Sequence, residues 1–185
     1  KVSPGFGGSC FKKDILNLVY LCRHYGLEQV ADYWHGVIKI NDYQQKRITE
    51  IIKNYFIKYS LEKKISILGW AFKKNTNDSR ESASIYITYQ LLKLGFKVNI
   101  YDPMVPRKKI LKDINVLDQT RGELNENYLS NIEVYETLES IVSTCKIITI
   151  LTEWDEFLSI EKISSDYEIF DFRNILNKKL VKLRL

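Results

Sequence analysis

The spacing of hydrophobic and polar positions changes near residue 60, and this change divides the chain into two parts. Before it, apolar residues recur every three or four positions, which predicts α-helices. The first helix is expected to begin near Asp14, as its N-cap or first-turn residue, and to close at Gly26. The second is expected over about residues 28–59 and would span roughly 45 Å. A small domain cannot cover such a helix, so we expect it to bridge two domains or to pair with a second subunit.

After residue 60 the spacing is that of an α/β fold. Short apolar runs predict buried strands at Lys64–Leu68 and Lys97–Tyr101, with a helix over Glu81–Leu94 between them. A strand–helix–strand unit implies a parallel pair joined by a right-handed crossover. The remaining elements expected are strands at 132–134, 146–151 and 168–172, a helix at 137–143 and a polar surface loop at 113–130.

These elements together predict an α/β fold with two parts. Residues 1–60 form a long-helix, all-α segment that carries a glycine-rich loop. Residues 61–185 form a Rossmann-like domain with an open, mainly parallel sheet.

Charge and composition narrow the function classes. The formal net charge of +5 comes from 28 basic and 23 acidic residues that are interleaved along the chain. A solvated, lysine-rich surface is enough to explain this excess of basic residues. Binding of an anionic small ligand is the more specific alternative. Nucleic acid is disfavoured as a partner because no basic stripe is interleaved with aromatic residues. No apolar run reaches the roughly 18 residues of a membrane helix, so no membrane partner is expected.

The cysteines indicate a reducing environment. Cys10, Cys22 and Cys145 cannot all pair, and none has the spacing of a metal site, so no metal is predicted. This usage favours a cytoplasmic location. Lys1 stands where a start methionine would be, and a glycine cluster follows almost at once, so the chain resembles the middle of a longer protein.

The segment Gly5–Asp14 is the strongest candidate for chemistry. Its glycines allow a ligand to approach the backbone, and Cys10 lies between this loop and a helix N-terminus. The helix dipole, together with Lys12 and Lys13, favours the thiolate form of Cys10. Asp14 follows one helical turn later, where it can position a water molecule. A tight turn with Cys10 as a small buried hydrophobe is the alternative, and the residues alone leave both open.

Two further motifs follow predicted strands. The segment Gly69–Lys74 lies at the carboxyl end of the first strand, where open α/β sheets bind ligands, but it lacks the GxGxxG of a dinucleotide site. Lys73 and Arg80 can meet phosphates or a sugar acid there, and a capped loop with solvated lysines is the alternative. Arg173 follows a later strand, and its planar guanidinium suits a diphosphate.

These motifs, in this order, resemble the UDP-glucose/GDP-mannose dehydrogenase family, most closely the branch that oxidises UDP-glucose. The segments that carry the resemblance are GFGGSCFKKD (Gly5–Asp14), NDYQ (Asn41–Gln44), ILGWAFKKNTNDSRES (Ile67–Ser82), IYDP (Ile100–Pro103), LTEWDEF (Leu151–Phe157) and FDFRN (Phe170–Asn174).

The resemblance implies an oxidoreductase that uses NAD to oxidise carbon 6 of UDP-glucose twice, giving UDP-glucuronate. By position, Cys10 would attack the aldehyde to form a thiohemiacetal, which oxidation turns into a thioester, and Asp14 would help to activate the hydrolytic water. The implied UDP-sugar contacts are Lys1, Val2, Ser3, Pro4, Gly5, Phe6, Gly7, Phe72, Lys73 and Arg173. The implied NAD contacts are Cys10, Phe11, Lys12, Lys13 and Arg80.

Three departures from the family pattern affect these expectations. Phe172 stands where the family usually has glycine, which questions how Arg173 reaches a ligand. Lys12 replaces a more common glutamine or proline. The family's N-terminal NAD domain, with its GxGxxG, has no counterpart here, so this chain is expected to be a fragment that cannot complete turnover. Self-association through the long helix, as a dimer or higher oligomer, is also expected.

Two other functions stay open at this point. One is a sister dehydrogenase acting on GDP-mannose or a UDP-N-acetylhexosamine, although FKKNTNDSRES and NDYQ favour UDP-glucose. The other is a non-catalytic module that binds nucleotide sugars, or a truncated subunit that assembles with intact partners. Retention of Cys10 with Asp14 argues against this second function.

Overall fold

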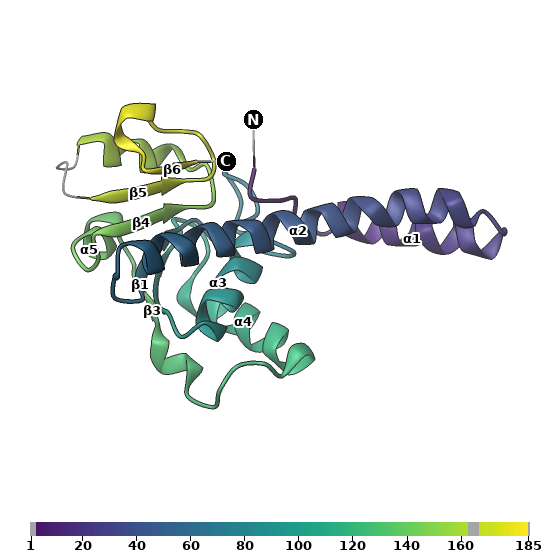
Figure 1. The fold of residues 1–185 in the computed structure, drawn as a ribbon, viewed down its shortest axis with the longest axis horizontal. Coiled ribbons are helices and arrows are strands. Elements are labelled where there is room, and N and C mark those ends of the chain that lie inside the picture. Colours follow the sequence, from purple (N-terminus) through teal and green to yellow (C-terminus); the bar gives the residue numbers. More distant parts are fainter. Residues whose placement is uncertain (1–2, 163–166, 185) are drawn as a thin grey trace.

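The computed structural model describes residues 3–162 and 167–184, and it has a two-helix arm attached to an α/β domain (Figure 1). Helix α1 (Phe11–His24) and helix α2 (Glu28–Lys58) pack side by side in the arm. The expected long second helix is therefore confirmed. Among the described residues, none of the helices is both long enough and apolar enough to cross a membrane.

Helix α2 joins two hydrophobic cores. Near its start, Ala31 and Ile38 pack with α1 residues such as Val19 in a small cluster. Near its end, Ile52 and Phe56 belong to the main core of the α/β domain. Because one continuous helix serves both clusters, the boundary at residue 60 does not coincide with a gap in packing, and that division stays a prediction.

The sheet has six strands in the order β3-β2-β1-β4-β5-β6, and every neighbouring pair is parallel. Order and direction are those of a doubly wound Rossmann-like sheet, so the expected fold class is confirmed. The strands are β1 (Lys64–Leu68), β2 (Lys97–Tyr101), β3 (Ile132–Val134), β4 (Ile147–Ile150), β5 (Glu168–Asp171) and β6 (Leu183–Arg184). The two-residue β6 gave no signal in the sequence.

Helices and short 3-10 turns connect these strands. The central strands β1 and β4 are almost wholly buried, as their apolar composition predicts. The connecting elements are α3 (Ala83–Lys93), α4 (Arg107–Arg121), α5 (Leu138–Val142) and the 3-10 turns at Tyr128–Asn131, Asp155–Lys162 and Lys178–Leu180.

The expected surface loop at residues 113–130 is wrong over its first half, because α4 continues to Arg121. Ile110 and Ile114 lie one turn apart and are fully buried, while most of the remaining helix surface is polar. So narrow an apolar stripe hides the helical period. The helix ends at Gly122, whose φ of 61° is the left-handed conformation that glycine adopts readily.

The helix expected from residue 81 begins two residues later. Ser82 is the N-cap of α3, and its hydroxyl accepts the backbone N–H of Ser84. Glu81 precedes the cap with a φ of 56°, so it belongs to the turn before the helix.

Candidate functional site

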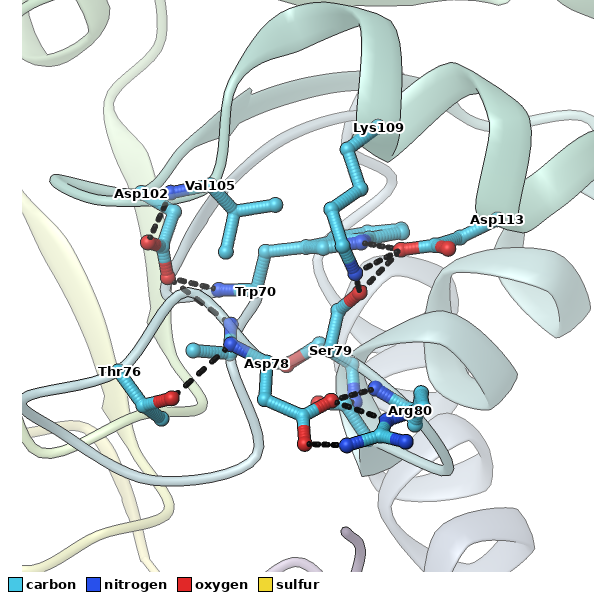
Figure 2. A network of polar contacts seen from close by, with 12 residues as sticks. Trp70, Thr76, Asp78, Ser79, Arg80, Asp102, Val105, Lys109 and Asp113 are labelled. Atoms are coloured by element: carbon cyan, nitrogen blue, oxygen red, sulfur yellow. Dashed lines mark hydrogen bonds and ion pairs between the residues drawn. The ribbon is translucent and has the colours of Figure 1, made fainter. Parts of the chain in front are cut away.

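The carboxyl edge of the sheet carries the loops that contain the predicted site residues, and a buried carboxylate ties these loops together. Asp102 follows β2 and is only 6% exposed. Its two oxygens accept N–H donors from the backbone of Trp70, Ala71, Met104 and Val105 and from the indole of Trp154. Figure 2 shows this carboxylate beside the Trp70 loop. Since its oxygens are fully engaged, Asp102 fixes the loops and is not free to bind a ribose.

A second polar network holds the turn that presents Arg80 (Figure 2). Ser79 is fully buried between Lys109 and Asp113, and Asp113 also accepts the indole N–H of Trp70 at 2.9 Å. Arg80 donates to both oxygens of Asp78, at 2.9 and 2.7 Å. The guanidinium itself remains exposed, so it is oriented but accessible.

Asp78 and Arg80 shift each other's pKa. Hydrogen bonding to Arg80 lowers the pKa of Asp78 despite its partial burial. The pKa of Arg80 is raised, mainly by its hydrogen bond to Asp78, and Cys10 is among the groups that add to this effect. The two parts of the chain meet at this turn, where the backbone carbonyl of Arg80 accepts the N–H of Gly8.

Cys10 is exposed and forms the N-cap of α1, with Asp14 in the first turn. This agrees with the expected position of a thiol at a helix N-terminus. The backbone N–H of Asp14 donates to the carbonyl of Cys10 at 2.8 Å, which confirms the predicted separation of one turn. The glycine-rich loop docks on the Arg80 turn, because Gly8 donates its N–H to the Arg80 carbonyl at 2.7 Å.

Most of the expected sugar-nucleotide residues line one pocket of about 570 Å³. This volume lies within the usual range for small-molecule sites. The glycine-rich loop forms one wall of the pocket. Phe72, in the loop after β1, and Arg173, after β5, also line it. The lining residues are Ser3, Gly5, Phe6, Gly7, Val37, Ile40, Asn41, Gln44, Phe72 and Arg173.

Arg173 reaches this pocket even though Phe172 precedes it. The Phe172 side chain is fully buried in the main core, and the positive φ of this turn falls on Asn174. Arg173 donates to the hydroxyl of Ser3 at 2.8 Å and forms an ion pair with Glu153. The phenylalanine therefore points inward and leaves the guanidinium at the ligand side.

Several expected site residues lie outside the pocket. Lys73 is exposed, with its ammonium 5.4 Å from the centre of the Phe72 ring, and Pro4 is buried. Phe11 and Lys13 are exposed on the first turn of α1. Lys1 and Val2 lie outside the residues that the structure describes.

Lys12 has a carboxylate partner that the sequence did not predict. It forms an ion pair with Glu81 at 2.7 Å. Burial lowers the pKa of Lys12, but the hydrogen bond to Glu81 and the nearby Tyr86 outweigh this, and the net pKa is raised. The positive charge of Lys12 is therefore partly balanced by the Glu81 carboxylate.

Helix α2 supplies pocket residues to which the motifs alone gave no role. Asn41 accepts the backbone N–H of Phe6 at 2.8 Å, and Gln44 donates to the Ser3 carbonyl at 3.3 Å. The available signal was Asn41, a polar residue in an otherwise apolar helical stripe. Glu153, the partner of Arg173, had no such signal. Within the described residues, no cluster of three or more His, Cys, Asp or Glu is arranged to hold a metal ion.

Comparison with known proteins finds two regions of one family in the chain. Residues 66–178 match the UDP binding domain of the UDP-glucose/GDP-mannose dehydrogenase family, and residues 1–43 match its central domain. UDP-glucose 6-dehydrogenase of Gallus gallus is 42% identical over 96% of this chain, and that of Caenorhabditis elegans is 40% identical over 98%. The chain spans only 36% and 38% of the length of these relatives.

Solved structures support the fold. A UDP-glucose dehydrogenase from Pyrobaculum islandicum matches with a TM-score of 0.72 and 23% identity, over 98% of this chain and 38% of its own length. A GDP-mannose dehydrogenase from Pseudomonas aeruginosa matches with a TM-score of 0.71 and 20% identity, over the same shares of both chains. The match to the UDP binding domain alone covers more than half of this chain. The chain therefore belongs to the UDP-glucose/GDP-mannose dehydrogenase family.

Proposed function

We propose that the protein carrying this chain is an NAD-dependent UDP-glucose 6-dehydrogenase, which oxidises carbon 6 of UDP-glucose twice to give UDP-glucuronate. The observation that carries this proposal is the pocket that the Gly5–Gly7 segment of the glycine-rich loop shares with Phe72 and Arg173. The choice of sugar is supported by relatives of 40–42% identity that bear this name.

In this proposal the pocket holds the nucleotide sugar. The guanidinium of Arg173 suits the diphosphate, because its fork of donors matches phosphate oxygens. Ser3, the Gly5–Gly7 segment and Phe72 would contact the ligand, and α2 forms the neighbouring wall of the pocket. Lys73, exposed next to Phe72, is a further proposed contact. Lys1 and Val2 are proposed contacts that precede the described residues.

Cys10 would then do the covalent chemistry. Its thiolate adds to the aldehyde carbon of the half-oxidised sugar, forming a C–S bond and a thiohemiacetal. Oxidation of that carbon gives a thioester. Water attacks the thioester while Asp14 accepts a proton, so that the C–S bond breaks and carboxylate and thiol are released. Holding the aldehyde on sulfur prevents its loss between the two oxidations.

The exposed start of α1 fits part of a dinucleotide. Within the part of the chain that the structure describes, the Cys10 side chain makes no capping hydrogen bond, which leaves the first N–H groups of α1 available for an anion. The Arg80 guanidinium is exposed as well and can contribute a positive charge. NAD, when bound, supplies the oxidising power for both steps. The two family matches are to the central and UDP binding domains, so most NAD contacts would come from outside this chain.

Mixing the full-length protein with NAD+ and UDP-glucose tests the proposal. We expect two NADH per UDP-glucose consumed, measured by absorbance. GDP-mannose and UDP-N-acetylhexosamines should raise the thermal midpoint less than UDP-glucose does. An absence of NADH with UDP-glucose would contradict the proposed activity, and a larger shift with another sugar would reassign the substrate.

Replacing Arg173 with alanine should weaken UDP-glucose binding. Hydrogen bonds to charged groups contribute about 1.5–3 kcal/mol, so we expect the Kd to rise about 10–100-fold. Isothermal titration calorimetry measures this. Arg23→Ala, on the exposed face of the arm, is the matched control and should leave the Kd unchanged. Equal affinities for both variants would remove Arg173 from the site.

We also propose self-association through the arm. Large exposed apolar side chains gather on α1 and the first half of α2, which is more than a solvated face needs. They are Phe11, Leu16, Tyr20, Leu21, Tyr25, Leu27, Val30, Tyr33, Ile40 and Tyr43. Light scattering of the full-length protein should give at least the mass of a dimer, and a monomer mass would refute this.

A further inference from the structure

Among the residues that the structure describes, few side chains hold the sulfur of Cys10 in place. It is exposed, and its recorded polar contact is the Ser9 hydroxyl at 3.5 Å. Because Cys10 is the N-cap of α1, its position follows from the first turn of that helix. Whatever fastens this turn to the α/β domain therefore determines where the sulfur lies relative to the pocket.

A cluster of three side chains makes this connection. Lys12, on the first turn of α1, donates to Glu81 Oε2 at 2.7 Å. The hydroxyl of Tyr86, on α3, donates to the same oxygen, and the Lys12 ammonium lies 3.4 Å from that hydroxyl and 5.3 Å from the ring centre. Burial and the bond to Glu81 raise the pKa of Tyr86 to about 12, so it remains a donor at neutral pH. We call these three residues the Lys12 cluster.

The backbone around Glu81 is shaped to the same loop. Glu81 has a φ of 56°, which residues with a Cβ rarely adopt. This conformation belongs to the turn whose Arg80 carbonyl accepts the N–H of Gly8 at 2.7 Å. Gly7 passes so close that a Cβ there would lie 2.5 Å from the Glu81 carbonyl oxygen. Side chain and backbone of this turn thus hold the cysteine loop on both sides of Cys10.

We propose that Glu81 is a positioning residue for Cys10: through Lys12 it fixes the first turn of α1 and so holds the thiol at the end of the loop whose Gly5–Gly7 segment lines the pocket. Tyr86 supports the Glu81 carboxylate from α3. The inference rests on the proposed function for its catalytic consequence. It also gives Lys12, a departure from the family pattern, a structural role that the sequence did not predict.

Variants of the full-length protein test this role. Glu81→Gln and Lys12→Met should each lower kcat by about tenfold, because small displacements of a reacting group are costly. KM for UDP-glucose should stay within about twofold, since neither residue lines the pocket. The double variant should be no worse than either single variant. The exchange Lys12→Glu with Glu81→Lys restores the ion pair and should recover most of kcat.

Hydrogen exchange gives a readout that does not depend on activity. The amides of Gly8 and Asp14 are hydrogen-bonded at the two ends of the cysteine segment. Their hydrogen-exchange rates should rise about tenfold in both single variants and return toward the parent rates in the variant with the two charges swapped. The matched control is Glu50→Gln with Lys53→Met, an exposed pair on α2 at 3.0 Å, which should change neither measurement.

Three results would overturn the inference. If the amide hydrogen-exchange rates of the single variants equal those of the parent, the cluster does not hold the turn. If amide hydrogen exchange is faster but kcat is unchanged, holding the turn does not serve the chemistry. If the variant with the two charges swapped has the parental thermal midpoint but recovers neither kcat nor the hydrogen-exchange rates, the ion pair is not the cause. If the parent protein makes no NADH, the proposed function fails, and the exchange rates alone still decide whether Glu81 holds the loop.

Discussion

Cys10→Ser in the full-length protein is expected to lower the steady-state rate of NADH formation by about a thousandfold or more. The proposed mechanism needs a thiolate to capture the aldehyde, and a serine hydroxyl is not ionised at neutral pH. Asp14 is the acidic residue of the first turn, and its proposed partner is water, not the residue at position 10. Stopped-flow and steady-state absorbance measurements of NADH give the rate.

The stoichiometry sharpens this prediction. Oxidation of the alcohol to the aldehyde forms no bond to sulfur, so Cys10→Ser can still release at most one NADH per UDP-glucose. Cys145→Ser is the matched control, because this half-buried thiol contacts the Lys64 carbonyl at the amino edge of the sheet, away from the pocket. Its rate should stay within about twofold of the parent rate. Two NADH per sugar from Cys10→Ser at the parent rate would refute the covalent mechanism.

The fold was largely predictable because its core elements carry strong local patterns. Strands β1 and β2 were expected with the bounds that they have, since each is a short apolar run next to a helix of clear period. Helix α4 was missed because only Ile110 and Ile114 are buried in it. Strand β6 consists of two residues, and its pairing with β5 is a tertiary contact that no local pattern encodes.

The motifs were enough to predict several of the residues that line the candidate pocket, but not which residues hold them in place. The loop, Phe72 and Arg173 were expected to act together, and they line one pocket. The partners that hold them could not be read from spacing, because Lys12 and Glu81 are separated by 69 positions and Phe6 and Asn41 by 35. Such pairs depend on how α2 and the sheet pack against each other, which is decided by the whole core.

Asp102→Ala is expected to lower the free energy of unfolding by about 3–5 kcal/mol. The substitution leaves several buried N–H donors without an acceptor, among them those of Trp70 and Ala71. A typical domain is stable by only about 5–15 kcal/mol, so the effect is a large part of the total. Urea denaturation followed by circular dichroism measures the change.

The substitution should also disturb the pocket wall, because the loop that Asp102 anchors at Ala71 continues directly into the lining residue Phe72. Asp155→Ala is the matched control: its carboxylate pairs with Lys74 at 2.7 Å but its side chain is 72% exposed. An exposed pair of this kind contributes about 0.2–1 kcal/mol. If Asp102→Ala costs no more than Asp155→Ala, the loops must be held by apolar packing, and Asp102 would be an ordinary polar residue at the end of β2.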